Sequence, residues 1–109
     1  MLVALIIDPL ILKNIAALSG HRMNLEILTP EKKLFSDEVY GVQLPGITGL
    51  FEVLDKHAPL VSALKAGRIK VLKDKQHHLA FFDIQSGFVE VHSNNVTVLA
   101  EGARPAETK

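Results

Sequence analysis

Histidine residues are the first groups in this sequence that could carry chemistry, because histidine binds metals and transfers protons near neutral pH. The five histidines are His21, His57, His77, His78 and His92. No two of them lie at helical ligand spacing, and the chain has no cysteine, so a metal site would need carboxylates brought together by the fold. The adjacent histidines at 77 and 78 stand in a polar stretch, which favours a solvated turn over a ligand pair.

A nucleophile and a phosphate-binding loop are also missing. Ser86 follows Gln85 rather than the glycine of a nucleophile elbow, and no helix is expected after it. Gly46 and Gly49 bracket a short loop, but the lysine followed by a hydroxyl residue that completes a phosphate-binding loop is absent. The sequence therefore predicts a protein that is not an enzyme, with no catalytic residue, no metal ligand, no cofactor and no small-molecule substrate.

The bulk composition limits the partners. The 109 residues fit one domain, with a globular composition of 48% hydrophobic and 22% charged residues. Its 12 basic and 12 acidic residues cancel and are scattered, so no nucleic-acid binding is expected. A domain this small buries only roughly two-thirds of its unfolded surface, so many apolar side chains must stay exposed or lie against a partner.

Residues 1–22 form an apolar segment that differs from the rest of the chain. Asp8-Pro9 interrupts it after seven residues, whereas a transmembrane helix needs about 20 apolar residues. No positive charge precedes Lys13, although a secretory signal normally opens with one. We therefore expect neither direct membrane insertion nor secretion, and the lack of cysteine suits the cytoplasm.

Two interpretations of this N-terminal extension stay open. Residues 10–18 have the pattern of a short apolar helix closed by Ser19-Gly20. The extension is either an upstream or vector-derived addition, with Met23 as the natural start, or an extra helix that packs on the domain or on a neighbour. The mass of the native protein would distinguish the two.

From Met23 onward, short runs of alternating apolar and polar residues are cut by turn residues at regular spacing, which is typical of an all-β sandwich. In the segment 68–73, for example, Ile69 and Val71 share one face. The segment 79–84 is almost wholly apolar, which indicates a strand covered on both sides. The expected strands are 24–28, 38–44, 50–54, 60–64, 68–73, 79–84, 88–92 and 96–100.

These segments predict an antiparallel two-sheet β-sandwich over residues 23–102. Residues 103–109 are expected to form a flexible tail, because Pro105 disfavours helix there. The domain organisation is therefore an N-terminal extension, one sandwich domain and a short tail.

Three blocks of residues follow one another within this domain. They are Leu25-Glu26-Ile27-Leu28-Thr29-Pro30 with Leu34-Phe35-Ser36; Gly46-Ile47-Thr48-Gly49-Leu50-Phe51 with Leu54, His57-Ala58-Pro59-Leu60, Leu64 and Gly67; and Ser86-Gly87-Phe88-Val89-Glu90-Val91 with Asn95-Val96-Thr97-Val98-Leu99-Ala100. In this order and spacing, the blocks resemble the N-terminal β-sandwich domain of the epsilon subunit of bacterial rotary (F-type) ATP synthases.

The resemblance implies a non-catalytic subunit of the central stalk, which couples rotation of the membrane-embedded c-ring to the gamma subunit during ATP synthesis. It also implies a peripheral position at the cytoplasmic face of the bacterial inner membrane. The alternative is an unrelated β-sandwich that serves as a protein-binding module. Whether protons or sodium ions drive the motor stays open.

The resemblance also assigns two surfaces. The residues that correspond to the c-ring-facing loop are Gly46, Ile47, Thr48, Gly49 and Leu50. The residues that we expect to contact gamma are His57, Ala58, Pro59 and Leu60, with His57 either in that contact or acting as a buried hydrogen-bonding spacer. Relatives often carry an acidic residue at the position of Leu50, so a more apolar contact with the ring is expected here.

Family members commonly carry a helical hairpin after the sandwich, which brakes ATP hydrolysis. The eight residues from Gly102 to Lys109 are too few for two helices. We therefore expect this chain to couple and assemble without acting as the brake, unless it is a shortened form of a longer subunit.

Overall fold

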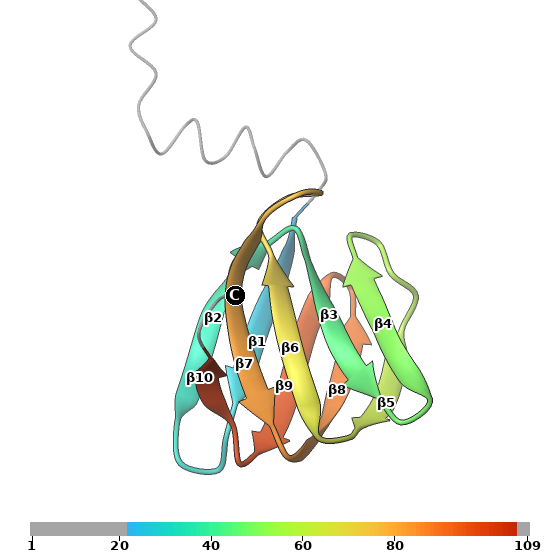
Figure 1. Ribbon diagram of the computed structural model, residues 1–109. Coiled ribbons are helices and arrows are strands. Elements are labelled where there is room, and N and C mark those ends of the chain that lie inside the picture. The colour runs from blue at the N-terminus through green and yellow to red at the C-terminus, as the bar shows by residue number, and fades with distance from the viewer. Residues whose placement is uncertain (1–21, 107–109) are drawn as a thin grey trace, which may run out of the picture.

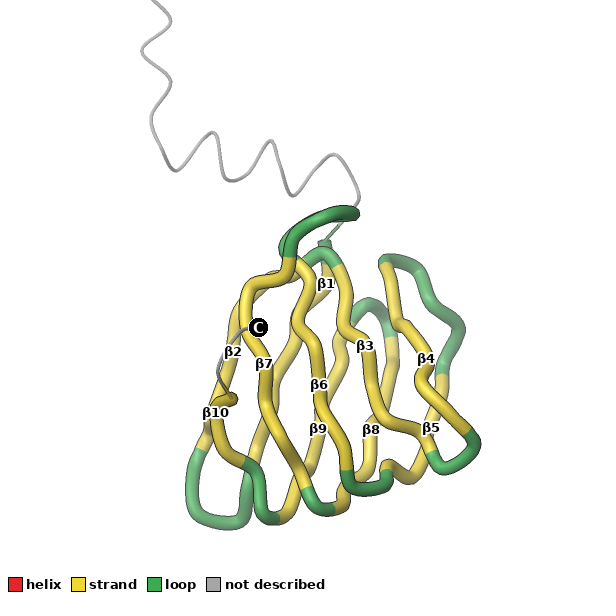
Figure 2. The backbone as a smooth tube through the Cα atoms, viewed as in Figure 1, coloured by secondary structure: helices red, strands yellow, loops and turns green. Residues whose placement is uncertain are grey.

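The computed structural model describes residues 22–106, which form ten β-strands and no helix (Figures 1 and 2). The strands are β1 Met23–Leu28, β2 Lys33–Val39, β3 Gly41–Gly46, β4 Gly49–Leu54, β5 Leu60–Leu64, β6 Gly67–Leu72, β7 His78–Ile84, β8 Ser86–His92, β9 Asn95–Glu101 and β10 Arg104–Ala106. The predicted all-β fold is confirmed, and the N-terminal extension lies outside the described residues except for Arg22.

The strands belong to one continuous sheet that folds over into two layers (Figure 1). The first layer contains β10, β7, β6, β3 and β4, and the second contains β5, β8, β9, β1 and β2. The layers join where Gly46 of β3 pairs with Leu64 of β5. This arrangement confirms the predicted two-layer sandwich.

One strand pair departs from a wholly antiparallel arrangement. β1 and β9 run parallel, with Leu25 opposite Val96 and Ile27 opposite Val98. Parallel neighbours need a long connection between them, and here the connection is almost the whole domain. In the strand order, β9 is the middle strand of the second layer and β1 lies beside it.

The segment 38–44, expected as one strand, is two strands in different layers. β2 ends at Val39 and pairs with β1, whereas β3 begins at Gly41 and pairs with β4 and β6. Val39 and Val42 both point into the core although they are three residues apart, so the chain changes layer between them. The single-strand prediction was wrong because Tyr40, Val42 and Leu44 alternate as one strand would.

The core lies between the layers and is wholly apolar among the described residues. The predicted inward positions are confirmed, because Leu25, Ile27, Ile69 and Val71 are fully buried. Burying each such side chain contributes about 1.5–3 kcal/mol. The remaining members of the core are Met23, Val39, Val42, Leu44, Val53, Leu64, Phe82, Ile84, Val89, Val91, Val96, Val98 and Ala100.

The C-terminal part of the described chain is an edge strand. Arg104–Ala106 forms β10, which pairs with β7 of the first layer. Pro105 is tolerated because an edge strand needs no ladder bond on its outer side. Pairing therefore continues past residue 102 into the expected tail, as far as Ala106.

Candidate interaction surfaces

The predicted c-ring-facing loop is the tip of the hairpin formed by β3 and β4. Gly46 pairs with Gly49, which leaves Ile47 and Thr48 as a two-residue turn. Gly49 has a φ of 141°, a conformation that side chains disfavour, whereas Gly46 is a regular strand residue. Ile47 is 58% exposed and Leu50 is 65% exposed, so this tip presents two apolar side chains to its surroundings.

The hairpin tip is fixed to the turn between β5 and β6. The amide of Lys65 donates a hydrogen bond of 2.9 Å to the carbonyl of Pro45, and Leu64 pairs with Gly46. Pro45 is itself fully buried, and the position of a Cβ on Gly67 would lie 2.7 Å from the Pro45 ring. The apolar tip therefore stands on a tightly packed base.

The residues predicted to contact gamma lie in the connector between β4 and β5 and at the start of β5. Asn94, in the turn between β8 and β9, holds this connector with two bonds of 2.7 Å: its Nδ2 donates to Asp55 Oδ1, and its Oδ1 accepts from the Lys56 amide. The ring of His57 is half-buried, and its Nδ1 donates to the Ala58 carbonyl at 2.8 Å.

The two predicted surfaces are at opposite ends of β5. Leu60 begins this strand and pairs with Val91, whereas Leu64 ends it beside the hairpin base. Four steps along a strand span about 13 Å. The structure therefore keeps these two surfaces apart, and whether they contact two partners stays a prediction.

Sequence reasoning missed a third surface, on the outer face of the second layer. We call it the apolar row. Its members lie opposite one another on four neighbouring strands: Ala63 of β5, Phe88 of β8, Leu99 of β9 and Leu28 of β1. Phe88 is 58% exposed and Leu99 is 55% exposed.

A groove of about 450 Å³ runs along the apolar row and is also lined by Pro30. At Gly87, a Cβ would lie only 2.5 Å from the Leu99 carbonyl oxygen, so the absence of a side chain lets β8 and β9 approach closely below the row. The signal in the sequence was Phe88 and Leu99 themselves, which are apolar at the outward positions of two alternating strands.

A second row runs beside the apolar row, two residues away along each strand. We call it the carboxylate row. It consists of Val61, Glu90, Thr97, Glu26 and Ser36, again paired in register. Glu26 forms an ion pair of 3.1 Å with Lys33, and Val61 is 73% exposed.

On the outer face of the first layer, neighbouring side chains cover the outward-pointing Phe81. Phe81 points outward from β7 but is only 8% exposed, because the His78 ring stacks on it at 4.5 Å and the Arg68 guanidinium lies 5.1 Å from its centre. The predicted two-sided cover of this strand is confirmed at Phe81, Phe82 and Ile84, although Leu79 is exposed.

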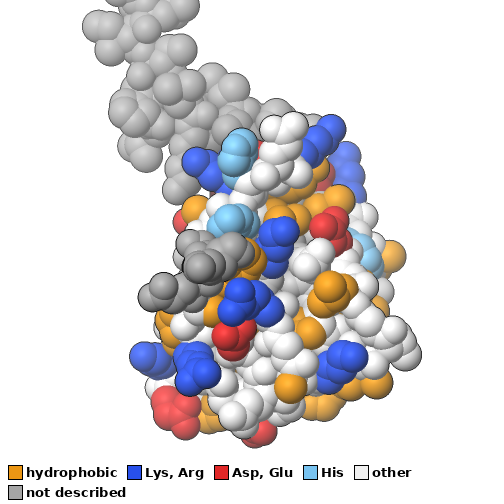
Figure 3. Space-filling model, in the orientation of Figure 1, with side chains coloured by type: hydrophobic (Ala, Val, Ile, Leu, Met, Phe, Trp, Pro, Cys, Tyr) orange, Lys and Arg blue, Asp and Glu red, His pale blue; other side chains and the backbone are white. Residues whose placement is uncertain are grey.

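Arg68 and Asp83 form an ion pair of 2.9 Å across β6 and β7 on this same face. The hydrogen bond from Arg68 lowers the pKa of the Asp83 carboxyl and raises the pKa of Arg68. Figure 3 views the molecule from this side and shows Lys and Arg side chains spread over it.

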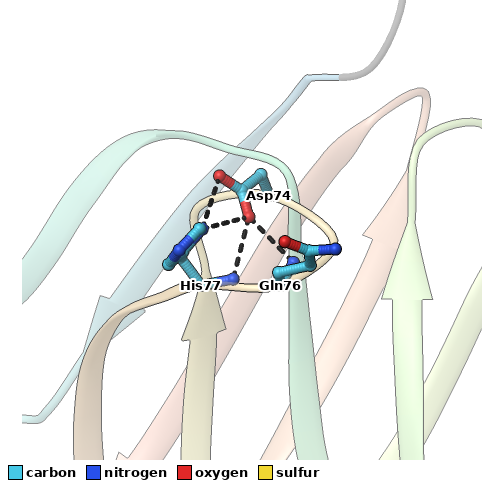
Figure 4. Close-up of polar contacts among 3 residues, drawn as sticks. All are labelled: Asp74, Gln76 and His77. Atoms are coloured by element: carbon cyan, nitrogen blue, oxygen red, sulfur yellow. Dashed lines mark hydrogen bonds and ion pairs between the residues drawn. The ribbon is translucent and has the colours of Figure 1, made fainter.

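Of the adjacent histidines expected in a turn, His77 lies in the loop between β6 and β7, whereas His78 is the first residue of β7 and stacks on Phe81, so the prediction was wrong for His78. Asp74 Oδ1 accepts hydrogen bonds from the amides of Gln76 and His77, both at 2.8 Å, and from His77 Nδ1 at 2.9 Å (Figure 4). The bond from the Gln76 amide, together with those from His77, lowers the pKa of Asp74. His77 is exposed and pairs within its own turn, so these contacts order the loop.

Residues 22–106 contain no cluster of three or more histidine, aspartate or glutamate side chains placed to hold a metal ion. In the same range there is no helix that is long and apolar enough to cross a membrane.

The fold and these surfaces define a β-sandwich domain with exposed apolar side chains on its outer surface. The sequence profile of the family "ATP synthase, Delta/Epsilon chain, beta-sandwich domain" matches residues 22–106, and the chain belongs to this family.

Several relatives carry the name ATP synthase epsilon chain. The protein of Chlorobium limicola is 43% identical over 86 residues, which cover 78% of this chain and 96% of that protein. The protein of Protochlamydia amoebophila is 42% identical over 77 residues, which cover 71% of this chain and 52% of that protein. The chain thus spans nearly all of one relative and about half of the other.

Solved structures of low identity share the fold. A chain in the mitochondrial ATP synthase of Euglena gracilis, solved as an assembly of OSCP, F1 and c-ring, superposes with a TM-score of 0.71 at 20% identity, over 78% of this chain and 54% of that chain. A chain in the central stalk and c-ring of the Tetrahymena thermophila enzyme has a TM-score of 0.62 at 17% identity, over 75% of this chain and 65% of that chain.

Proposed function

We propose that this protein is a non-catalytic subunit of the central stalk of a rotary ATP synthase, where it couples the c-ring to the gamma subunit. The observation that carries the proposal is the open apolar row on a domain of the epsilon-chain family. The Tetrahymena neighbour belongs to a central stalk with its c-ring, and the Euglena neighbour to an assembly that includes a c-ring, which supports the same position.

In this proposal the hairpin tip contacts the c-ring. Ile47 and Leu50 are both exposed and apolar, so the contact depends on burial of apolar surface rather than on a charge at Leu50. The tip lies at the end of the sandwich, which suits a contact with the loops of a ring at the membrane surface (Figure 1).

The gamma subunit covers the outer face of the second layer in this proposal. The apolar row supplies the centre of the contact. The connector with His57 borders the same layer at the end of β5 that lies away from the hairpin tip. Permanent interfaces between subunits are large and apolar, so a row of exposed Phe and Leu side chains is what such a contact requires.

Coupling requires a stiff connection between the hairpin tip and the apolar row, and it requires no reactive group. The hairpin base is hydrogen-bonded and paired to β5, and β5 is paired along its length with β8, which carries Phe88. A force applied at the tip therefore reaches the apolar row through paired strands instead of through a loop. As part of the complex, the subunit lies peripherally at the cytoplasmic face of the bacterial inner membrane.

Hydrogen exchange on this chain, alone and reconstituted with gamma and with the c-ring of the same organism, tests the proposal. We expect gamma to slow exchange in β8, β9 and the connector, and the ring to slow it at the hairpin tip. If neither partner binds, or if protection appears only on the first layer, the proposal is wrong.

A further inference from the structure

The apolar row is bordered by negative charge on one side. The carboxylate row lies two residues away along each strand, which is about 7 Å. It places Glu90 and Glu26 beside Phe88 and Leu28 respectively, with Thr97 between the two carboxylates. An apolar partner that covers Phe88 must therefore approach Glu90 as well.

The outer face of the second layer has more acidic than basic side chains. Glu38 of β2 lies opposite Asn24, one row beyond Glu26 on the same face. Lys33 neutralises Glu26 at 3.1 Å, whereas Glu90 and Glu38 have no ion pair among the described residues. The opposite flank of the apolar row carries Glu101 and, just past the end of β5, Lys65, so it has no excess of either sign. The negative excess is thus confined to the flank with Glu90.

We propose that the partner surface docking on this face is an apolar strip with Lys or Arg along one side, placed so that the basic groups meet Glu90 and Glu38. This inference rests on the proposed function, in which that surface belongs to gamma. It adds the charge of the partner surface and fixes which way the strip lies across the strands.

The physical reason is the cost of burying an unpaired carboxylate. Removing Glu90 from water against an apolar surface would be strongly unfavourable, whereas a basic partner offsets the loss of hydration. Opposite charges also steer the two proteins together and reject the reversed orientation, in which the basic side would meet the neutral flank.

A second copy of this chain fits the face poorly. The outer face of the first layer carries the basic strand residues Arg68 and Arg104, which are exposed, and Lys70, which is half-buried. Its phenylalanine, however, is already covered by His78 and Arg68, and its exposed leucines stand apart on β4 and β7, with β3 and β6 between them. That face therefore offers no continuous apolar strip to Phe88. The complementary surface therefore belongs to a different protein.

The test measures the affinity of the full chain for gamma at about 0.01 M and about 1 M salt, where the Debye length is roughly 30 Å and 3 Å. We expect Glu90→Lys to weaken binding about 10- to 100-fold at low salt and less at high salt. Glu52→Lys makes the same charge change on the outer face of the first layer and should leave affinity within about twofold.

Glu90→Gln removes the charge without adding one, and we expect about a tenfold loss at low salt only. Equal affinities of Glu90→Lys and Glu52→Lys for gamma would overturn the inference while leaving gamma as the partner. The same holds if the affinity of the wild-type chain does not change with salt concentration. Failure of the wild-type chain to bind gamma would instead overturn the proposed function. Self-association that Glu90→Lys abolishes would show that a second copy occupies the face.

Discussion

Phe81 and Phe88 occupy matching places on the two outer faces of the sandwich but differ in surroundings. Both point outward from a strand with paired neighbours on each side, yet Phe81 is 8% exposed and Phe88 is 58% exposed. His78 and Arg68 cover the first ring, and no described side chain does the same for the second. The first layer covers its outward phenylalanine with its own side chains, whereas the second layer leaves its outward phenylalanine exposed.

This difference shows that an outward apolar side chain can contribute either to stability or to binding, depending on what covers it. A cover made by neighbouring side chains contributes to the stability of the isolated protein. An apolar surface left open contributes only when the partner arrives, so it appears in the affinity. Replacing the outward phenylalanine should therefore lower the stability of the protein on the first layer and the affinity for the partner on the second.

The largest expected effect is on stability, from Phe81→Ala. Removing a ring that is covered by two side chains should lower the free energy of unfolding by about 3 kcal/mol. Urea denaturation of the full chain, at unchanged m-value, measures it. Phe88→Ala is the matched control, and equal losses from the two substitutions would mean that the two faces do not differ in the way described.

Phe88→Ala should act on binding instead. We expect the affinity for gamma to fall about 30-fold, because a central aromatic contact in an interface contributes about 2 kcal/mol. Isothermal titration with purified gamma measures the loss. A variant that binds normally would show that the apolar row is not the contact, whatever its effect on stability.

A smaller effect is expected from His78→Ala, which uncovers one side of Phe81. The stacked pair at 4.5 Å should contribute about 1 kcal/mol to the free energy of unfolding. His92→Ala, at an exposed outward position of β8, is the control and should change stability very little. Thermal unfolding curves of the two variants would settle whether the cover over Phe81 matters.

The smallest expected effect depends on pH and comes from Asp83→Asn. The pKa of Asp83 is lowered in the folded protein, first by the hydrogen bond from Arg68. Its stabilisation is therefore present above the ordinary carboxyl pKa and disappears as the pH falls through the lowered value. The difference in unfolding free energy between wild type and variant should shrink from about pH 7 to about pH 2.

Glu52→Gln, on the same face but without an ion pair among the described residues, serves as the control for that titration. Its stability relative to wild type should change less over this pH range. If the difference in unfolding free energy between wild type and Asp83→Asn does not depend on pH, the ion pair with Arg68 adds no stability to the cover of Phe81.

Most of the strand pattern could be predicted from sequence, because one side of each strand faces an apolar core. The alternation at Leu25 and Ile27, and again at Ile69 and Val71, corresponds directly to full burial. The turn at Gly46 to Gly49 followed from its glycines, although only Gly49 has the positive φ. These features depend on near neighbours in the chain.

The features that were missed depend on contacts between distant segments. Nothing local marks Tyr40 as the point where the chain changes layer, since alternation continues through it. The apolar row joins residues 28, 63, 88 and 99, so it becomes visible only when the strand order is known. The partners of the two candidate contacts stay predictions until binding is measured.

The parallel pairing of β1 with β9 has a consequence for synthesis on the ribosome. Asn24 bonds to Asn95 across 71 positions of the chain, so the middle of the second layer has no partner for β1 until nearly all of the domain has emerged. Until then β1 can pair only with β2, and its other edge stays open to chaperones and proteases. A translation product interrupted before β9 would therefore lack the pairing of β1 with β9 and would leave that edge of the sheet open.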